Sequence, residues 1–457
     1  MSPADPVPPP ALPAAADVAV IGAGAAGFTA ALRAAEAGAG VVLLNAHPRP
    51  GLKILMSGGT RCNVTHRQVG ERDFHGGSAH VVARILRAFP VEATLEWFAG
   101  LGVELKLEET GKYFPLTDDA HTVLEALVGA VERAGVRVEC GARVVRLERL
   151  EPGGYRLGIQ RVADSNAFSA SVAAHREGTW PLPADEPAEW IEARAVILAT
   201  GGLSFPRTGS DGTGYALATA LGHTLVAPVP ALTPLAGEDP LCTAAQGLSA
   251  DAELTLWAAG KREVTVRGPL LVTHFGFSGP AALDLSRHWL RASEAGEPRV
   301  TASFVPGQTR EALLAAWIAK VAEAPYSTVR RFLVRRLPER LAEILCAEAG
   351  IEPATQISQV PRAKRAAFIE RVCARPLAVT GTLGYEKAEC TAGGVPLSEV
   401  DASTLESRRS AGLYLSGEIL DVEGRLGGFN FQWAWSSGTV AGRAAGRKVL
   451  AETPKVS

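Results

Sequence analysis

Three glycines near the start of the chain are the first residues whose types and spacing could do chemistry. Gly22, Gly24 and Gly27 form a G-x-G-x-x-G pattern within the stretch AVIGAGAAGFTAALRAAEAG. In a dinucleotide-binding turn the first glycine makes the tight turn, the second lets a pyrophosphate approach the backbone, and the third lets helix and strand pack closely. The N-terminus of the following helix offers free N–H groups and a partial positive charge to the phosphates. The pattern therefore predicts a dinucleotide site.

The residues around these glycines predict the elements that must position them. A β-branched run over 17–21 predicts a buried strand, 25–37 predicts a helix that ends at Gly38, and 41–44 predicts a second strand. Within such a strand–turn–helix–strand frame the glycine pattern is specific, whereas alone it is weak. The candidate cofactor-binding residues of this unit are Gly22, Gly24, Ala25, Ala26, Gly27, Asn45 and Ala46.

Asn45 stands where such a unit usually places an Asp or Glu that binds the ribose hydroxyls. Its amide oxygen can accept a hydrogen bond but brings no charge, so we expect a bond weaker by about 1 kcal/mol. On this reasoning Asn45→Glu should tighten cofactor binding or leave it unchanged. Repulsion from a neighbouring acid or phosphate would reverse that sign.

A second glycine loop follows, Ser57-Gly58-Gly59-Thr60, and it suits the same pyrophosphate or the edge of a flavin. Cys62 lies next to it, but Arg67 stands where a disulfide reductase would have its second cysteine, so dithiol chemistry is not expected. Packing within the loop is the simpler role for this cysteine. The candidate cofactor-binding residues here are Lys53, Ser57, Gly58, Gly59, Arg61, Cys62 and Asn63.

Two distant stretches favour FAD over NAD. An apolar strand over 191–199 ends in the sequence ATGG, which is typical of flavoproteins whose chain re-enters the FAD domain. Near the C-terminus a strand ends in Gly417-Glu418, where FAD enzymes contact the ribityl chain and pyrophosphate, and a helix then points its N-terminus at the flavin. A third strand is predicted over 136–140, and in flavoproteins the residue at the position of Val144 often contacts the adenine. The candidates in these segments are Val144, Ala199, Thr200, Gly201, Gly202, Gly417, Glu418, Asp421, Gly428, Phe429 and Asn430.

Two side chains are candidate proton donors. His274 lies between a predicted strand and the helix over 280–290, and a neutral histidine titrates in the working range. Tyr113, in the stretch GKYFP, is a similar candidate. A structural role remains open for both, and Ser278 could cap the helix. Neither a metal-binding cluster nor a Ser-His-Asp arrangement is visible.

The composition indicates a large globular protein. The chain has 457 residues, 47% of them apolar and 21% charged, with a net charge of −2, and nothing global points to nucleic acid or an anionic membrane. The scattered cysteines predict reduced thiols in the cytoplasm, and residues 1–15 predict a flexible leader that is not a signal peptide. The sequence contains no apolar run of about 20 residues, so no membrane span is predicted.

We therefore predict an α/β fold, with a Rossmann-like FAD-binding domain and an inserted β-barrel-like plus helical domain. The predicted FAD domain covers 16–230 and 386–457, and the inserted substrate-side domain covers 231–385, helical from about 309 to 373. Residues 163–188 are polar and proline-containing, and predict a loop. The cationic side chains of the helical part are expected to be solvated. The alternative is a patch that binds the phosphate of NADPH or RNA. These cations are Arg330, Arg331, Arg335, Arg336, Arg340, Lys364 and Arg365.

Several long stretches resemble one family. They include SGGTRCNVT, ATGGLSFPRTGSDGTGYALA, LLVTHFGFSGPAALDLS and GEILDVEGRLGGFNFQWAWSSG, spread over nearly the whole chain. The chain resembles the BaiN-type NAD(P)/FAD-dependent oxidoreductases, some of which are named aminoacetone oxidase. It departs from them at Asn45, where Glu is usual, and in the insertion at 163–188. The resemblance implies FAD, an inserted domain and redox chemistry on a small organic substrate.

The sequence thus predicts an FAD-dependent oxidoreductase whose flavin carries the chemistry. A second Rossmann fingerprint is missing, so NAD(P)H, if used, is expected to bind transiently over the flavin. Three functions stay open: an NAD(P)H-dependent reductase, perhaps of an activated C=C bond; an oxidase that makes hydrogen peroxide from an amine or aminoketone; and an RNA-associated flavoprotein. A small molecule is the expected partner, and nucleic acid and membrane are not.

Overall fold

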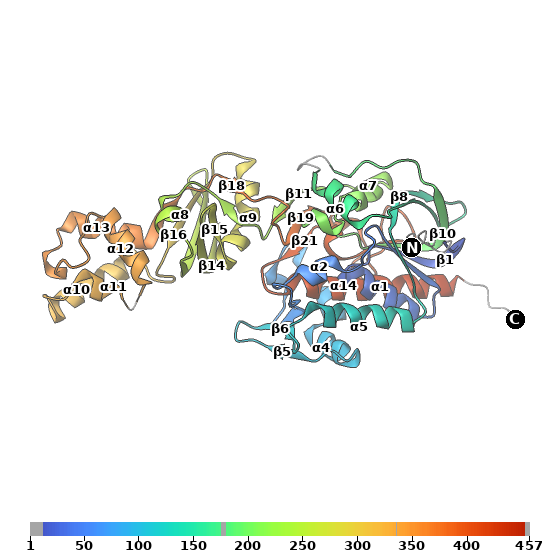
Figure 1. Cartoon of the computed structure of the whole chain (residues 1–457), viewed down its shortest axis with the longest axis horizontal. Helices are drawn as coiled ribbons and strands as arrows, with labels where there is room; N and C mark the ends of the chain where they lie inside the picture. The colour runs from blue at the N-terminus through green and yellow to red at the C-terminus, as the bar shows by residue number, and fades with distance from the viewer. Residues whose placement is uncertain (1–11, 175–179, 335, 453–457) are drawn as a thin grey trace, which may run out of the picture. The chain divides into compact units, whose positions relative to one another are not determined.

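The structure, a computed structural model, describes residues 12–174, 180–334 and 336–452. The chain divides into two compact units (Figure 1). Unit 1 contains the residues up to Pro228 and those from Cys390 onward, and unit 2 runs from Val229 to Glu389. Most of the predicted leader lies outside the described residues, but its last residue, Ala15, already begins the first strand.

Unit 1 is built on a seven-stranded sheet in the order β7-β2-β1-β10-β9-β8, with β20 also paired to β10. The strands β7, β2, β1, β10 and β20 pair in parallel, whereas β8 and β9 are antiparallel. Their bounds are β1 Ala15–Ile21, β2 Val41–Asn45, β7 Arg137–Cys140, β8 Ala142–Arg149, β9 Tyr155–Arg161, β10 Glu189–Leu198 and β20 Leu413–Leu415. The apolar runs of β1, β2 and β10 are buried, as expected for parallel strands covered on both faces.

Three long helices of unit 1 lie side by side in Figure 1: α1 (Ala25–Glu36), α5 (Ala120–Arg133) and α14 (Phe429–Ala451). The helices α1 and α14 pack closely because α14 presents glycines to the backbone of α1. A Cβ at Gly438 would lie 2.6 Å from the Ala26 carbonyl oxygen, and one at Gly442 would lie 2.3 Å from that of Ala30. This packing fixes the N-terminus of α14 relative to the dinucleotide turn.

The loop predicted over 163–188 is wrong in its first part, where α6 (Ser165–Ala174) forms. The Asp164 carboxylate accepts hydrogen bonds from the backbone N–H groups of Asn166 and Ala167, which satisfies the start of the helix. Phe168 and Val172, four residues apart, are both buried. The helix is therefore stabilised by its own cap and by an apolar stripe that the polar composition concealed.

Unit 2 contains a seven-stranded sheet in the order β17-β16-β13-β14-β15-β12-β18, with antiparallel pairing throughout. The two edge strands β17 and β18 leave this sheet open along the described pairings, where the sequence predicts a barrel-like one. The strands are β12 Leu235–Ala236, β13 Ser249–Ala258, β14 Lys261–Thr273, β15 Gly276–Ser278, β16 Arg299–Ser303, β17 Arg375–Leu377 and β18 Gly381–Thr382.

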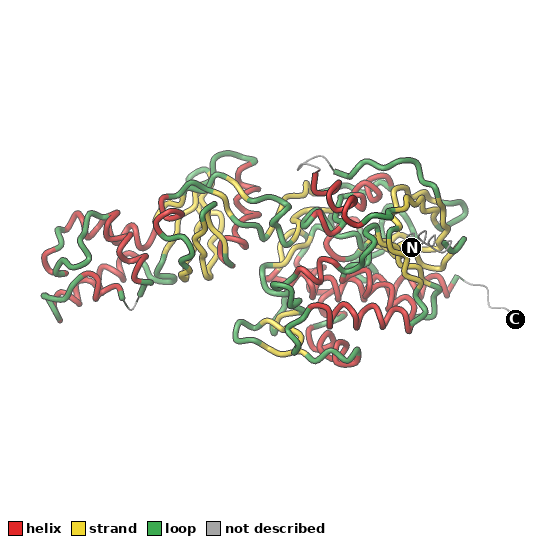
Figure 2. The backbone as a smooth tube through the Cα atoms, viewed as in Figure 1, coloured by secondary structure: helices red, strands yellow, loops and turns green. Residues whose placement is uncertain are grey.

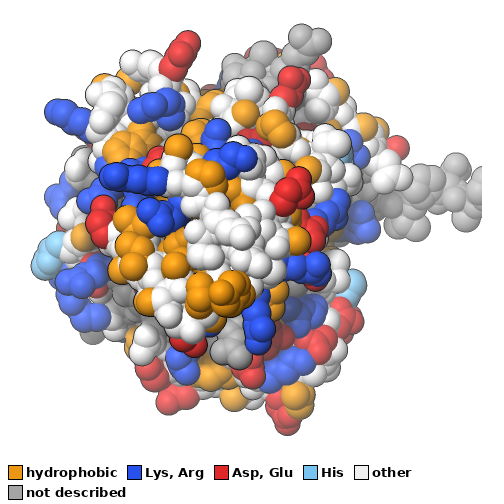
Figure 3. All heavy atoms as spheres, turned by 90° about the vertical axis from the view of Figure 1, so that its left-hand side faces the viewer, with side chains coloured by type: hydrophobic (Ala, Val, Ile, Leu, Met, Phe, Trp, Pro, Cys, Tyr) orange, Lys and Arg blue, Asp and Glu red, His pale blue; other side chains and the backbone are white. Residues whose placement is uncertain are grey.

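The helices of unit 2 fall into two groups, as Figure 2 shows. The helices α8 (Pro240–Ala244) and α9 (Pro280–Ser293) contact the sheet, and four others form a helical part around Trp317, Phe332 and Phe368, of which α13 also contacts β16 and β17. These are α10 Arg310–Glu323, α11 Val329–Leu333, α12 Glu339–Glu348 and α13 Arg362–Ala374. In Figure 3 this helical part faces the viewer.

Shorter elements complete unit 1. They are α2 Leu52–Met56, β3 Thr65–His66, β4 Phe74–Gly76, α3 Ala79–Ala88, α4 Val91–Gly100, β5 Leu105–Leu107, β6 Lys112–Pro115, α7 Thr213–Ala220, β19 Cys390–Gly394 and β21 Val422–Gly424, while β11 Val226–Ala231 crosses the unit boundary. Across the described ranges, none of the helices has the length and apolar character needed to cross a membrane. All six cysteines are free thiols.

Candidate cofactor site

The dinucleotide turn joins β1 to α1, and its three glycines have different surroundings. A Cβ at Gly22 would lie 2.4 Å from the Ala199 carbonyl oxygen, and one at Gly27 would lie 1.7 Å from the Gly22 carbonyl oxygen. A Cβ at Gly24, in contrast, would meet no atom within 4 Å. Gly22 and Gly27 are therefore needed for packing, whereas Gly24 leaves backbone facing open space where a phosphate could approach.

Asn45, at the end of β2, is held by the protein itself. Its amide oxygen accepts a hydrogen bond from the Ala23 N–H at 3.1 Å, and its amide nitrogen donates to the carbonyl oxygens of His47 (2.6 Å) and Arg49 (3.3 Å). A carboxylate has no N–H to donate, so Glu at this position would face two carbonyl oxygens. The geometry thus opposes the expectation that Asn45→Glu would be tolerated or beneficial, while the contact of Asn45 with a ribose stays a prediction.

The second glycine loop follows α2. The Ser57 hydroxyl donates to the Ile54 carbonyl at 2.8 Å, Gly58 and Gly59 both have positive φ, and a Cβ at Gly59 would meet nothing within 4 Å. This is a second stretch of open backbone in unit 1. Among the described residues the buried Asn63 Oδ1 has no hydrogen-bond partner, which leaves an acceptor for a ligand donor.

Arg61 and Cys62 follow this loop and have different surroundings. Arg61 binds Glu108 at 2.7 Å and lies over the ring of Phe114, 4.0 Å from its centre, so its role as a cofactor ligand stays a prediction. Cys62 is fully buried, and burial raises the pKa of its thiol to about 12, against a hydrogen bond from Ser57 that lowers it. A raised thiol pKa disfavours the reactive thiolate, and the expectation that Cys62 does no dithiol chemistry stays a prediction.

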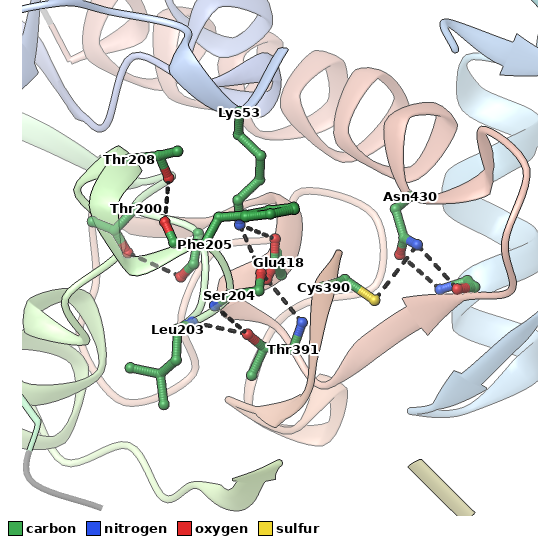
Figure 4. Close-up of polar contacts among 12 residues, drawn as sticks. Lys53, Thr200, Leu203, Ser204, Phe205, Thr208, Cys390, Thr391, Glu418 and Asn430 are labelled. Carbon is green, nitrogen blue, oxygen red and sulfur yellow. Dashed lines mark hydrogen bonds and ion pairs between the residues drawn. The ribbon is translucent and has the colours of Figure 1, made fainter. Parts of the chain in front are cut away.

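Figure 4 shows a polar cluster that joins four segments of unit 1. The Lys53 ammonium group on α2 donates to Glu418 Oε2 at 3.0 Å and to Ser204 Oγ at 2.9 Å. The Ser204 hydroxyl and the Thr391 N–H both donate to Glu418 Oε1, at 2.8 and 2.9 Å. A Cβ at Gly202 would lie 2.9 Å from Glu418 Oε1 and 2.4 Å from Thr391 Oγ1, so the strand-end glycine makes room for the cluster.

The segment beside this cluster holds a strained residue. Phe205 has left-handed backbone angles (φ 49°, ψ 63°) although it is not glycine and precedes Pro206. Its carbonyl oxygen accepts both the hydroxyl (2.7 Å) and the N–H (2.9 Å) of Thr208, which hold the conformation. Such strain is concentrated at ligand sites in many proteins.

The C-terminal candidates lie around the start of α14. Gly417 has φ 76°, and a Cβ there would lie 2.7 Å from the Ala26 Cβ in the first turn of α1. Asn430 binds both backbone groups of Gly424, and Phe429 is fully buried and stacks on His66 with ring centres 4.8 Å apart. Gly428 caps the helix with φ 91°. The free N-terminus of α14 thus belongs to the same unit as Gly24 and Lys53.

The remaining candidates are placed as follows. Val144 is buried on β8, Thr200 packs against Gly214, and Asp421 is buried beside Gly76. Tyr113 is half-buried on β6, opposite Thr65. His274 is exposed in unit 2, with its ring 5.1 Å from that of Phe275, so its part in any site of unit 1 stays a prediction.

Two details differ from expectation. The helix α9 begins at Gly279 without a side-chain cap, so the predicted Ser278 cap is wrong. Ser204 and Thr391 were missed, although both lie in stretches of small and polar residues next to recognised motifs. Across the described ranges there is no group of three or more His, Cys, Asp or Glu side chains that could hold a metal ion.

Comparison with known proteins shows the family to which this chain belongs. A family model described as the HI0933-like protein Rossmann domain matches residues 16–444. The chain belongs to the HI0933-like family. The resemblance to BaiN-type flavoproteins is thereby confirmed, and the protein is an FAD-dependent oxidoreductase with a Rossmann-type FAD-binding domain.

Members of the family match this chain over nearly its whole length. It is 34% identical to the 3-dehydro-bile acid delta(4,6)-reductase of Clostridium scindens, over 94% of this chain and 99% of the relative. It is 31% identical to the ribosomal RNA dihydrouridine synthase of Escherichia coli, over 92% and 96%. Among solved structures, the 3-ketosteroid-delta4-(5alpha)-dehydrogenase of Rhodococcus jostii RHA1 is 18% identical and covers 95% of this chain and 96% of its own, with a TM-score of 0.45.

Proposed function

We propose that this protein reduces a carbon–carbon double bond conjugated to a carbonyl group, using reducing equivalents that NADPH or NADH delivers to FAD. The observation that carries the proposal is that two relatives, each matched over more than nine-tenths of this chain, have names that describe one kind of bond change. A 3-dehydro, delta(4,6) bile acid has C=C bonds conjugated to its 3-oxo group. Dihydrouridine is uridine whose C5=C6 bond, conjugated to the C4 carbonyl, has been reduced.

The residues of unit 1 fit the cofactor that this chemistry needs. Gly24 and Gly59 leave open backbone for a dinucleotide, and Asn63 offers a buried acceptor. When bound, FAD supplies hydride transfer. Burial raises the pKa of the Cys62 thiol, which disfavours a dithiol route and favours direct transfer.

Reduction of a conjugated C=C bond adds a hydride to the carbon β to the carbonyl and a proton to the α carbon. The protein must therefore supply a proton donor, for which Tyr113 and His274 are the candidates. Tyr113→Phe removes one hydroxyl and keeps the ring, so it tests the first candidate with little change in packing.

The experiment is an anaerobic incubation of the flavoprotein with NADPH or NADH and the steroid 4-en-3-one 4-androstene-3,17-dione as probe, in parallel with an rRNA transcript. Gain of two hydrogen atoms by either probe, detected by mass, supports the proposal. Turnover that needs oxygen and an amine, and that releases peroxide, would instead establish the oxidase that the sequence left open.

RNA is the second candidate substrate, because of one feature of unit 2. Tyr326 is 81% exposed, and the side chains of Arg331 and Arg362 are exposed and have no polar partner among the residues described. Figure 3 shows Lys and Arg side chains around apolar ones on the face turned to the viewer. Aromatic rings stack on bases and arginines bind phosphates.

Three other cations of this helical part have partners within the protein. Arg330 pairs with Glu339, Arg336 lies over the ring of Phe332, and Arg340 donates to the Gln246 carbonyl oxygen; Arg335 lies outside the described residues. If RNA binds here, reversing Arg331 and Arg362 to Glu should weaken binding of an rRNA fragment and flatten its salt dependence, whereas Arg262→Glu on β14 should not. Equal effects of the two changes would argue against this surface.

A further inference from the structure

The cluster in Figure 4 has a consequence for cofactor binding. We propose that Lys53 is a cofactor ligand that also neutralises Glu418, so that this carboxylate can lie beside a bound dinucleotide. Glu418 and Ser204 position the ammonium group, and the third N–H of Lys53 donates to the cofactor. This inference rests on the FAD that family membership implies, and not on the proposed substrate.

Both ends of the cluster are attached to the dinucleotide turn. The Gly51 N–H, at the start of α2, donates to the Ala23 carbonyl oxygen at 2.9 Å. On the other side Gly417, the neighbour of Glu418, lies against Ala26 in the first turn of α1. The Lys53–Glu418 pair therefore flanks the turn in which Gly24 leaves the backbone open.

Lys53 has an unused hydrogen-bond donor among the described residues, whereas most of the acceptor capacity of Glu418 is used. An ammonium group has three N–H donors, and two of those of Lys53 go to Ser204 and Glu418. No described residue takes the third, and the Lys53 side chain keeps 25% of its exposure. Glu418 instead accepts from three groups, which leaves it little capacity for the ribityl hydroxyl that its strand-end position predicted.

The charges explain why the pair is needed. FAD carries a negatively charged diphosphate, and a half-buried carboxylate beside it would repel the cofactor. Lys53 cancels that charge, and Ser204 and Thr391 hold the carboxylate turned toward Lys53. Removing Lys53 alone should therefore cost more affinity than removing both charges.

The test is titration of the apo-protein with FAD, followed by fluorescence, for Lys53→Met, Glu418→Gln and the double variant. We expect Lys53→Met to weaken FAD binding at least about tenfold, equivalent to about 1.4 kcal/mol, and the double variant to bind FAD more tightly than Lys53→Met. The loss in Lys53→Met should shrink at high salt, which screens the exposed charge. Lys53→Arg, which keeps the charge, should bind nearly as well as the parent.

The matched control is Lys448→Met, because Lys448 and Glu406 form another half-buried pair in the same unit. Thermal unfolding of each apo-protein separates folding from binding, and Lys53→Gln replaces Lys53→Met if the latter does not fold. Unchanged FAD binding in Lys53→Met would overturn the proposal. A double variant weaker than either single one would also overturn it, because Glu418 would then be a ligand in its own right. Neither result bears on which substrate is reduced.

Discussion

Unit 1 contains two clusters of almost the same residue types. They differ in whether a hydrogen-bonding group is left for a ligand. In the first, Lys53, Ser204 and Glu418 leave one N–H donor without a partner among the described residues, at a site with some exposure. In the second, His223 bonds Glu399 at 2.7 Å and Ser407 at 2.8 Å.

The second cluster is closed. The His223 side chain is fully buried, and the Ser407 hydroxyl oxygen also accepts the N–H groups of Arg409 and Ser410. Although Ser, His and Glu in a row could serve as a nucleophilic triad, the serine oxygen is occupied and unreachable. Residue types and distances therefore do not define a site, and free hydrogen-bond capacity with access to a ligand separates the two clusters.

The glycines of the dinucleotide turn show the same contrast. The largest effect on stability should come from a glycine that is enclosed by other atoms. Gly27→Val would place a Cβ 1.7 Å from the Gly22 carbonyl oxygen, so the backbone would have to move. We expect a loss of more than about 4 kcal/mol of stability, or no folded protein. Normal unfolding temperature and FAD content in this variant would contradict the packing that we describe.

The next largest loss of stability is expected in the buried cluster of His223, Glu399 and Ser407. His223→Ala removes one hydrogen bond to the buried Glu399 carboxylate, which keeps its bonds from Thr224 and Arg409, and losing a hydrogen bond to a charged group costs about 2–3 kcal/mol. Chemical denaturation measures the loss. FAD affinity of the folded fraction should stay within about threefold, or about 0.6 kcal/mol; a selective loss of FAD binding would move this cluster into the cofactor site.

The same cluster should make stability depend on pH. Burial lowers the pKa of His223, and for Glu399 hydrogen bonds from Thr224, His223 and Arg409 outweigh burial and lower its pKa to about 2. Both groups bind protons more readily when unfolded, so stability falls as pH drops, first below the ordinary pKa of histidine and then between about 4.5 and 2. Glu399→Gln should flatten the acid part of the curve, and an unchanged curve would argue against it.

An open glycine should behave differently. Gly24→Val places its Cβ where no atom lies within 4 Å, so the apo-protein should keep its unfolding temperature. FAD affinity should drop at least about tenfold, or about 1.4 kcal/mol. Equal losses in apo- and holo-protein would show that Gly24 serves folding only.

The smallest effect concerns Asn45. Because its amide donates to His47 and Arg49, Asn45→Glu should weaken FAD binding and stability by about 1 kcal/mol. Calorimetry of the apo-protein with a matched FAD titration gives the sign. Tighter FAD binding would restore the ribose interaction expected from sequence as the main role of this residue.

The local parts of this fold could be predicted because their signals are local. The run from β1 through Gly22, Gly24 and Gly27 to α1 and β2 needs only neighbouring residues, and so do the glycines at the ends of β10 and β20. The polar cluster could not be predicted, since Ser204 and Lys53 meet Glu418 across 214 and 365 positions. Asn45 shows a third case, in which the position was recognised but its hydrogen bonds to two nearby carbonyls were not.

The central claim, that this FAD-dependent oxidoreductase works as an NAD(P)H-dependent reductase, is tested most directly by one anaerobic titration. The purified protein is mixed with NADPH or NADH, its flavin absorbance is followed, and 4-androstene-3,17-dione or an rRNA transcript is then added without oxygen. We predict that the absorbance is lost with one nucleotide and returns with one of the two acceptors. A flavin that neither nucleotide reduces, or that recovers only when oxygen is admitted, would contradict the account.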